Sequence, residues 1–372
     1  MKYLPNSQDD LPERSMKDSH DYGVIPLLNN FQLRDKYIAT SGHVRLGRLM
    51  EDMDLFAGHI AFKHAYYPGV PEGLPSPIVI VTISVSQIEF LDFIKVPPDL
   101  DVRLSGHVSW VGNTSLEIAV WIHQFSNGVW NQITRALFLM ASRNSINTGA
   151  AFVNRLKFNS EEEKKLFAGG EERKLNRKKK MKESLLTTVP TAEELHTIHS
   201  LFVDTISSKE LFSNKRILPS NSKWMHDTVQ SSLIFCHPQH RNIHNKIFGG
   251  FLMRHALELS WIIGFMHGLN IPKLVRISDI GFYHPVEVGS IVKMFGCITY
   301  TEDNFIQIFV IAEALGPMKL ESKESIVFNF TYDLGKKTDN VIPQSYPEAI
   351  QYLDGRRNFK NKIHLEIGDS IL

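Results

Sequence analysis

The sequence predicts an α+β protein that contains two copies of one folding unit, each a long helix followed by antiparallel strands. Three observations support this fold class. Residues 44–63 and 249–265 carry apolar side chains at three- and four-residue spacing, as helices with one buried face do. Strand-like runs follow both helices. Residues 106–118 also align without a gap to residues 296–308, at an offset of 190 residues, and both segments read as strand, polar turn and strand.

The composition bounds the class of protein. The chain has 372 residues, of which 43% are hydrophobic and 22% charged, as in globular proteins with a sizeable core. Its net charge of +1 gives no overall field to recruit nucleic acid or an anionic membrane. No apolar run approaches the roughly 20 residues of a membrane span. Two cysteines, Cys236 and Cys297, provide no disulfide framework and favour a reducing compartment.

The first 35 residues read as an irregular N-terminal arm, with prolines at positions 5, 12 and 26 and little periodicity. They do not resemble a signal peptide. Asp9, Asp10 and Glu13 argue against a transit peptide, because such segments are rich in arginine and poor in acids. The chain is therefore either cytosolic or a mature or truncated form of a longer precursor.

The first unit is expected at residues 36–158. Its helix carries one apolar stripe, and a Pro/Gly-rich connection follows at residues 67–77. The expected strands are Ile78–Phe90, Asp101–Val111, Ser115–His123 and Gln132–Ser142.

Residues 159–228 are expected to be a charged linker with bridging short helices. The basic run Arg177–Lys180 fits a solvated linker helix better than a binding patch. The second unit is expected at 229–335, and a C-terminal extension at 336–372. Aligning the helices on Gly47 and Gly250 gives an offset of 203 residues, so the first unit has about 13 more residues between helix and strands.

Gly249 and Gly250 lie where the second helix begins, after a polar loop. The first N–H groups of a helix have no partner within the helix, and its dipole favours negative charge there. The pair can hold an anion or a polarised carbonyl oxygen. It is equally compatible with glycines needed only for a tight turn or close packing.

Three motifs carry a family resemblance: residues 248–254, 285–290 and 106–117. They resemble the hotdog-fold acyl-CoA thioesterases and, more closely, the mitochondrial acyl-CoA thioesterase 9 type, which has two hotdog domains in one chain. The resemblance runs from about Leu11 to Phe359. It implies an intrachain pseudo-dimer of hotdog domains, an acyl-CoA substrate, no redox or metal cofactor, and a homo-oligomer of three double units. It also implies a mitochondrial location, with the cytoplasm as the alternative.

The resemblance further implies a composite catalytic site. The family's helix acid falls on Asp54, as general base on water or as nucleophile, opposite the glycine loop of the other unit. That loop contributes Asn242, Asn245, Gly249 and Gly250, with backbone N–H groups for the oxyanion. Asn245 stands where the family has glycine and is expected to take left-handed backbone geometry or to orient water.

The mirror-image site is expected to be inactive. Asp54 follows Gly47 by seven residues, whereas Leu257 occupies the matching position after Gly250. Glu258, one residue further on, is a second candidate for a catalytic acid, or it pairs locally with Arg254. Solvent-facing positions are expected for Glu51 and Asp52.

Coenzyme A needs cations near its phosphates, and the candidates are Lys246, Arg254 and Arg143. The acyl chain needs apolar walls, for which Met50, Phe251 and Trp261 are candidates, although they fit the core equally well.

His237, His240 and His244 lie close in sequence, but their apparent loop lacks a carboxylate to complete a metal-ligand set, so no metal site is predicted. Two rival functions remain: a hotdog acyl-thioester dehydratase, and a non-catalytic acyl-CoA-binding or regulatory protein.

Overall fold

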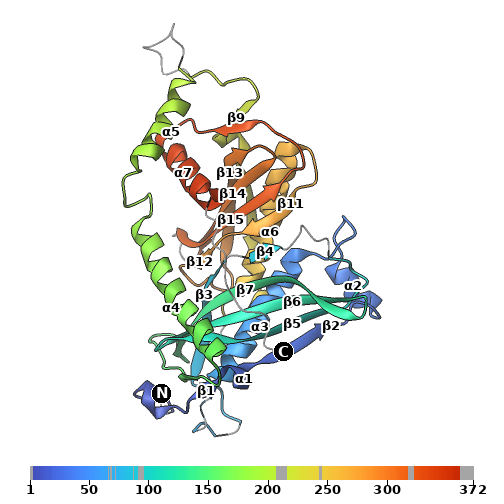
Figure 1. Ribbon diagram of the computed structural model, residues 1–372, viewed down its shortest axis with the longest axis vertical. Coiled ribbons are helices and arrows are strands. Elements are labelled where there is room, and N and C mark those ends of the chain that lie inside the picture. Colours follow the sequence, from blue (N-terminus) through green and yellow to red (C-terminus); the bar gives the residue numbers. More distant parts are fainter. Residues whose placement is uncertain are drawn as a thin grey trace.

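The computed structural model describes residues 3–65, 67, 69–71, 73–86, 88–90, 96–206, 216–242, 245–316 and 322–360. Figure 1 shows an α+β fold in two halves, with the first half below, the second above, and a helical segment joining them along one side. The end of the expected C-terminal extension, 361–372, and His244 lie outside the described residues.

The first half begins with short elements and continues with a long helix and strands. These are η1 (Gln8–Asp10), β1 (Arg14–Ser15), α1 (Met16–Ser19), β2 (Asp21–Ile25), α2 (Phe31–Tyr37), α3 (Leu46–His64), β3 (Ile78–Val85), β4 (Ile88–Phe90), β5 (Val102–Val111), β6 (Ser115–Ser126), β7 (Val129–Asn144), β8 (Leu156–Lys157) and α4 (Glu161–Lys182). The expected helix is confirmed as α3, and the first expected strand is divided into β3 and β4.

The second half follows a connecting helix, α5 (Ala192–Val203). Its elements are β9 (Ser222–Trp224), η3 (Met225–Thr228), β10 (Gln230–Phe235), η4 (Pro238–His240), α6 (Gly249–Gly268), β11 (Lys273–Ile277), β12 (Ile280–Phe282), β13 (Ile291–Glu302), β14 (Phe305–Leu315), β15 (Ser322–Asp333), β16 (Asn340–Ile342) and α7 (Tyr346–Lys360).

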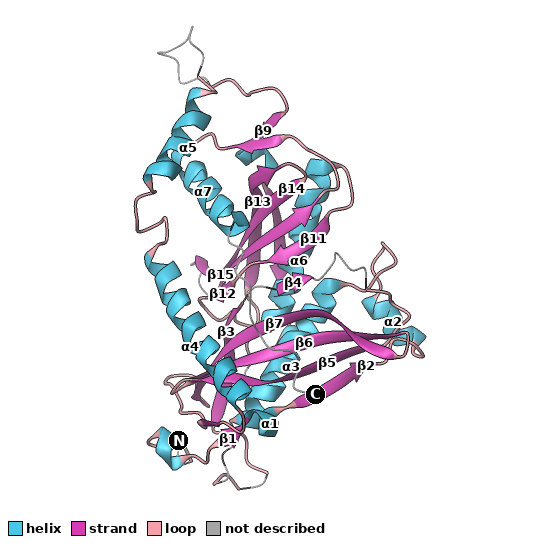
Figure 2. Ribbon diagram, in the orientation of Figure 1, coloured by secondary structure: helices cyan, strands magenta, loops and turns pink. Residues whose placement is uncertain are grey.

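Twelve of the strands in the described residues form one antiparallel sheet that runs through both halves. The halves join where β11 pairs with β4 and β12 pairs with β3. The repeated hairpins β5–β6 and β13–β14 each contain a register shift at the matching place, Val108/Trp110 and Ile298/Tyr300. Figure 2 shows the helices distributed around this shared sheet.

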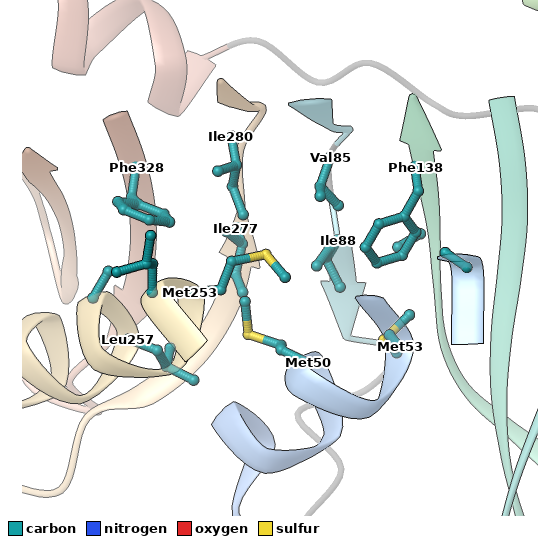
Figure 3. Packing of buried hydrophobic residues seen from close by; sticks show 14 of the residues in the cluster. Met50, Met53, Val85, Ile88, Phe138, Met253, Leu257, Ile277, Ile280 and Phe328 are labelled. Carbon is teal, nitrogen blue, oxygen red and sulfur yellow. The ribbon is translucent and has the colours of Figure 1, made fainter. Parts of the chain in front are cut away.

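The buried core is continuous across the junction of the two halves. Figure 3 shows Met50 of α3 and Met253 of α6 side by side, with Phe138 and Phe328 further out on their own strands. Met50 and Met253 are related by the helix offset of 203 residues, and the two phenylalanines by the strand offset of 190. The halves are therefore related in packing as well as in sequence.

The N-terminal arm was expected to be irregular, but its residues 14–25 form ordered elements that have counterparts in the second half. β2 forms an edge of the large sheet through β5, as β10 does through β13. Ser19 Oγ accepts the Val108 N–H at 3.0 Å, and Thr228 Oγ1 accepts the Ile298 N–H at the same distance. Met-x-Asp-Ser at 16–19 and Met-x-Asp-Thr at 225–228 are the sequence signal for this relation.

The helix expected in the charged linker is confirmed as α4, but it is docked rather than solvated. Arg173 and Arg177 pair with the fully buried Glu117 of β6 at 2.6 and 3.5 Å. Leu166 of α4 packs on Trp121 and its neighbours, on the side of the sheet opposite α3. The basic run therefore begins in an ion pair that fixes the helix to the first half.

The helix α7 is the counterpart of α4 in the second half. Both helices open with the motif Ser-x-x-Glu, at Ser160 and Ser345, and the serine hydroxyl accepts the glutamate N–H. Both also contain a glycine against the sheet, Gly170 and Gly355, at the same offset of 185 residues. Each half thus includes an outer helix that the expected boundaries had assigned to a linker and an extension.

None of the described helices has the length and apolar character needed to cross a membrane.

Replacing Gly170 by alanine is expected to destabilise the protein. A Cβ atom there would lie 2.4 Å from Cβ of Trp110, so the helix must move away from the sheet. Overpacking of this kind costs about 1–3 kcal/mol in the free energy of unfolding. Urea denaturation measures it. The control is Gly58→Ala on α3, where a Cβ atom would meet nothing within 4 Å. Equal stability of Gly170→Ala and wild type would contradict the close packing.

Candidate active site

Asp54 lies on α3 with its carboxylate directed at the start of α6 in the other half. Its Oδ2 atom accepts the backbone N–H of Gly250 at 2.8 Å, and Oδ1 accepts the hydroxyl of Thr82 at 2.8 Å. The residue is only 3% exposed. The structure thus brings together the predicted acid and the predicted glycine pair, which lie almost 200 residues apart in sequence.

Both glycines are required by close approach. A Cβ atom on Gly249 would lie 2.9 Å from Oδ2 of Asp54, and one on Gly250 would lie 2.7 Å from Cα of Glu51. The glycine pair therefore fits close packing and exposed N–H groups at the same time, so the two interpretations left open for it are compatible. Absence of side chains allows the helices to touch, and the same contact exposes backbone N–H groups to the carboxylate.

The environment of Asp54 balances two effects on its protonation. Burial raises the pKa of the carboxyl group to about 6, while the hydrogen bonds from Thr82 and Gly250 act in the opposite direction. The positive end of the α6 dipole also favours the ionised form. A carboxylate with a pKa near neutrality is suited to general-base catalysis, because it is ionised at pH 7 and still basic.

Thr82 was missed by sequence reasoning. It is a polar residue within the apolar strand β3, and that interruption is the only signal the sequence offers. Thr82 lies on β3 and Asp54 on α3, so the Thr82 hydroxyl meets the Asp54 carboxylate only when the chain is folded.

The loop before α6 has the predicted backbone geometry. Asn245 adopts a φ of 58°, which confirms the left-handed conformation expected for it. The side chain of Asn242 accepts the Lys246 N–H at 3.1 Å. This hydrogen bond and the left-handed Asn245 shape the loop that leads into Gly249.

Glu51 and Arg254 form an ion pair between the two helices, which corrects the solvent-facing position expected for Glu51. Glu51 is 6% exposed rather than solvent-facing, and its Oε1 atom lies 2.8 Å from Nε of Arg254. Arg48 also pairs with Glu51, at 2.5 Å. Arg254 also lies 3.8 Å from Glu258.

The second acid candidate, Glu258, takes the pairing role. Its carboxylate lies 2.7 Å from Arg45 and 3.8 Å from Arg254. The contacts of the described residues do not place it with Asp54. Its nearest partner, Arg45, belongs to the other half, so the expected local pair with Arg254 is the weaker of the two contacts.

The other two predicted cations are also engaged elsewhere. Lys246 forms an ion pair with Glu287. Arg143, on β7, donates to the carbonyl of Asn147 at 3.3 Å. None of the three predicted cations contacts the Asp54 carboxylate among the described residues, and their part in coenzyme binding stays a prediction. Of the proposed acyl-chain residues, Met50 and Phe251 are buried in the core, whereas Trp261 is 38% exposed.

A cavity of about 210 Å³ lies beside the site. Its walls include Glu51 and Phe248, the two residues that a side chain on Gly250 would strike. It also contains two cations that sequence reasoning missed, Arg48 and Arg241. Arg48, Glu51, Asp52 and Leu55 share one face of α3, a spacing from which this wall was predictable.

Asp52 also differs from the expected solvent-facing acid. It accepts the hydroxyl of Tyr37 at 2.8 Å, and burial raises the pKa of its carboxyl group to about 6. It lines the cavity rather than the Asp54 site.

The position of the second half that corresponds to Asp54 carries no carboxylate. Leu257, 7% exposed, takes the place of Asp54, and Gly47 packs against Arg254. Ile277 pairs with Phe330 as Thr82 pairs with Met140, so the threonine is also replaced by an apolar residue.

Within the described residues no group of three or more His, Cys, Asp or Glu side chains is placed to hold a metal ion.

The chain is 40% identical over 359 residues to the mitochondrial acyl-coenzyme A thioesterase 9 of Bos taurus, a match that covers 96% of this chain and 81% of that protein. It is 38% identical over 360 residues to the mitochondrial acyl-coenzyme A thioesterase 10 of Mus musculus, with the same coverage. An acyl-ACP thioesterase structure from Bacteroides thetaiotaomicron matches 86% of this chain and all of that one, at 11% identity and a TM-score of 0.48. No protein-family model matches the chain.

At this identity over nearly its whole length, the chain belongs to the family of acyl-coenzyme A thioesterases. Within that family it groups with the mitochondrial types 9 and 10, and the resemblance drawn from its motifs is confirmed.

The Glu51–Arg254 pair is expected to couple the stabilities of α3 and α6. Arg254→Met leaves Glu51 largely buried beside one cation and is expected to lower the free energy of unfolding by about 3 kcal/mol. The double variant Glu51→Gln/Arg254→Met is expected to lose less than the sum of the single variants, because neither charge is stranded. Chemical denaturation of all four proteins measures the coupling, and additive losses would exclude it.

Proposed function

We propose that this chain hydrolyses acyl-CoA thioesters to a free carboxylic acid and coenzyme A, with Asp54 as general base. The observation that carries the proposal is the buried Asp54 carboxylate, hydrogen-bonded at 2.8 Å to the first turn of a helix from the other half. Family membership supports the reaction, and the geometry supports the residues.

In the proposed reaction, Asp54 takes a proton from a water molecule as the water oxygen forms a bond to the thioester carbonyl carbon. The carbonyl π electrons move to oxygen and give a tetrahedral oxyanion. When they return, the carbon–sulfur bond breaks and the electron pair leaves with sulfur. The proton held by Asp54 then passes to the thiolate, which regenerates the carboxylate and releases coenzyme A.

The two glycines receive different roles in this proposal. The Gly250 N–H already donates to Asp54, so it holds the base in position and favours its ionised form. The Gly249 N–H has no acceptor among the described residues, and Gly249 lies directly against Asp54. Gly249 is thus the better candidate for the oxyanion donor. Stabilisation of the oxyanion by a preorganised donor usually contributes more to the rate of acyl transfer than any other single interaction.

The coenzyme arm is assigned to the cavity beside the site. Arg48 and Arg241 supply positive charge there, and Phe248 and Phe251 supply apolar surface. Arginine suits phosphate groups because its planar guanidinium group donates in pairs. Lys246, Arg254 and Arg143 stay candidates beside them. Arg254 pairs with Glu51, as Arg48 does, and its guanidinium lies over the Phe251 ring, so its contacts border the same cavity.

We also propose that each half is one hotdog domain, and that the two domains form an intrachain pseudo-dimer with one working site. The shared sheet, the adjacent helices α3 and α6, and the loss of the acid at Leu257 support this arrangement. A mitochondrial location is proposed from the names of the relatives. A homo-oligomer of three chains and independence from a cofactor remain family expectations.

Asp54→Asn is expected to lower kcat/KM for acyl-CoA hydrolysis by about 100- to 10,000-fold, the usual contribution of a positioned general base. Asparagine keeps the shape and can still accept the Gly250 N–H, so the fold is expected to be retained. Release of free thiol, followed with a thiol reagent, measures the reaction and separates a hydrolase from a protein that only binds acyl-CoA.

The matched controls are Asp52→Asn and Glu258→Gln. Asp52 lies on the same helix with a similarly raised pKa, but its side chain meets Tyr37 instead of Gly250. Both controls are expected to retain the chemical step. Activity that survives in Asp54→Asn and disappears in Glu258→Gln would assign the base to the second helix.

The pH profile is expected to report Asp54. The base must be ionised, and its pKa is raised to about 6, so kcat/KM should fall tenfold for each pH unit below that value and level off above it. Thr82→Val removes a hydrogen bond that lowers this pKa, so the acid limb should move to higher pH. A lower rate with an unshifted limb would mean that Thr82 does not tune the carboxyl group.

A further inference from the structure

The outer helices α4 and α7 are equivalent, but they pack differently on their sheets. In the second half, α7 contributes Tyr352 and Phe359 to an aromatic cluster at the end of the β13–β14 hairpin. Tyr300 lies 5.3 Å from Tyr352 and 5.4 Å from Phe359, and Phe305 lies 6.0 Å from Phe359, between ring centroids. Four rings therefore fill the space between the helix and the hairpin.

Two of these rings have no counterpart in the first half. The offsets of 190 and 185 residues place Ser115 at the position of Phe305 and Lys174 at the position of Phe359. Trp110 and Phe167 keep aromatic rings at the other two positions. A cavity of about 470 Å³ lies between these four residues. Loss of the two rings explains why the first half has a space where the second has a packed cluster.

This cavity is separate from the Asp54 site. It lies under α4, which packs on the face of the sheet opposite α3, as Figure 1 shows. None of its lining residues belongs to the candidate active site or the neighbouring cavity.

The lining combines apolar walls and a charged rim with four polar side chains, Gln8, Asn113, Thr114 and Ser115. Trp110 and Leu156 are 1% and 8% exposed. The side chains of Arg155 and Lys174 are 50% and 38% exposed, so part of each cation faces solvent at the mouth. Arg155 also forms an ion pair with Asp9. The single carboxylate, Glu171, is already engaged, since it accepts the Trp110 indole N–H at 2.8 Å and pairs with Lys174 at 3.4 Å.

We propose that this cavity is a second ligand site, which takes an amphipathic monocarboxylate such as the free acid that hydrolysis releases. The apolar walls accept the alkyl chain, and Lys174 and Arg155 bind the carboxylate at the rim. The choice of the reaction product as ligand rests on the proposed function. The volume lies within the range of small-molecule sites.

The test is calorimetric titration of octanoate into the full chain whose active site has first been saturated with a non-hydrolysable S-alkyl coenzyme A thioether. Octanoate is expected to bind this complex. Lys174→Met removes the charge and keeps the stem, and is expected to weaken binding by roughly tenfold or more, the effect of one charge-assisted hydrogen bond. Ser115→Phe/Lys174→Phe restores the rings of the second half and is expected to abolish binding.

The matched control is Lys178→Met, a change of charge at an exposed position of the same helix that does not line the cavity. It should bind octanoate as wild type does. Absence of binding to the wild-type complex, or equal binding by the double variant, would overturn the proposal. The titration needs no turnover, so a failure of the Asp54 assignment would leave this readout intact and remove only the link to the product.

Discussion

The contact between α3 and α6 is the constraint on which the rest of the structure depends. Two helices approach closely only where side chains are absent, and Gly47 and Gly250 provide that absence at equivalent places. Gly47 of α3 packs against Arg254 of α6, and Gly250 of α6 packs against Glu51 of α3. Glu51 and Arg254 occupy equivalent positions, because the helix offset of 203 residues relates them. They pair with each other, so an ion pair lies where the two helices of the repeat meet.

That ion pair explains why the halves are not interchangeable. In a dimer of identical halves, the same charge would meet itself at this centre, and like charges in a largely buried position are strongly unfavourable. With glutamate on one helix and arginine on the other, only the mixed pairing is favourable. The asymmetry continues outward, where Asp54 and Thr82 face Gly250 on one side and Leu257 and Ile277 lie on the other. One polar site and one apolar contact have replaced two equal sites.

The outer helices α4 and α7 also share a framework and differ in the side chains placed on it. Both α4 and α7 begin with a serine cap, place a glycine on the sheet and cover a hairpin. Their remaining side chains have diverged, so one helix closes its hairpin with aromatic rings and the other leaves a space with a cationic rim. The two halves thus share one framework, and the side chains placed on it differ.

The sequence by itself determined the α+β class, the duplicated helix and hairpin, the glycine pair at the start of α6 and the acid at Asp54. The class, the repeat and the glycine pair follow from local periodicity and from spacing within each half, both of which a sequence displays directly. Asp54 was indicated by the resemblance to the thioesterase family. The shorter repeated motifs at 16–19 and 160–163 were also present, but a relation among so few residues becomes evident only when both copies make the same hydrogen bonds.

Only the tertiary structure decided the partners of the charged and polar side chains. Glu51 was expected in solvent, yet it is buried between two arginines, Arg48 three residues away and Arg254 about 200 residues away in sequence. A charge that leaves water needs such partners, and only the fold supplies the second one. Thr82 joins the site through strand pairing, and Asp54 acquires its raised pKa through burial by both halves. Burial and long-range pairing are properties of the assembled core, and for that reason no local pattern in the sequence reports them.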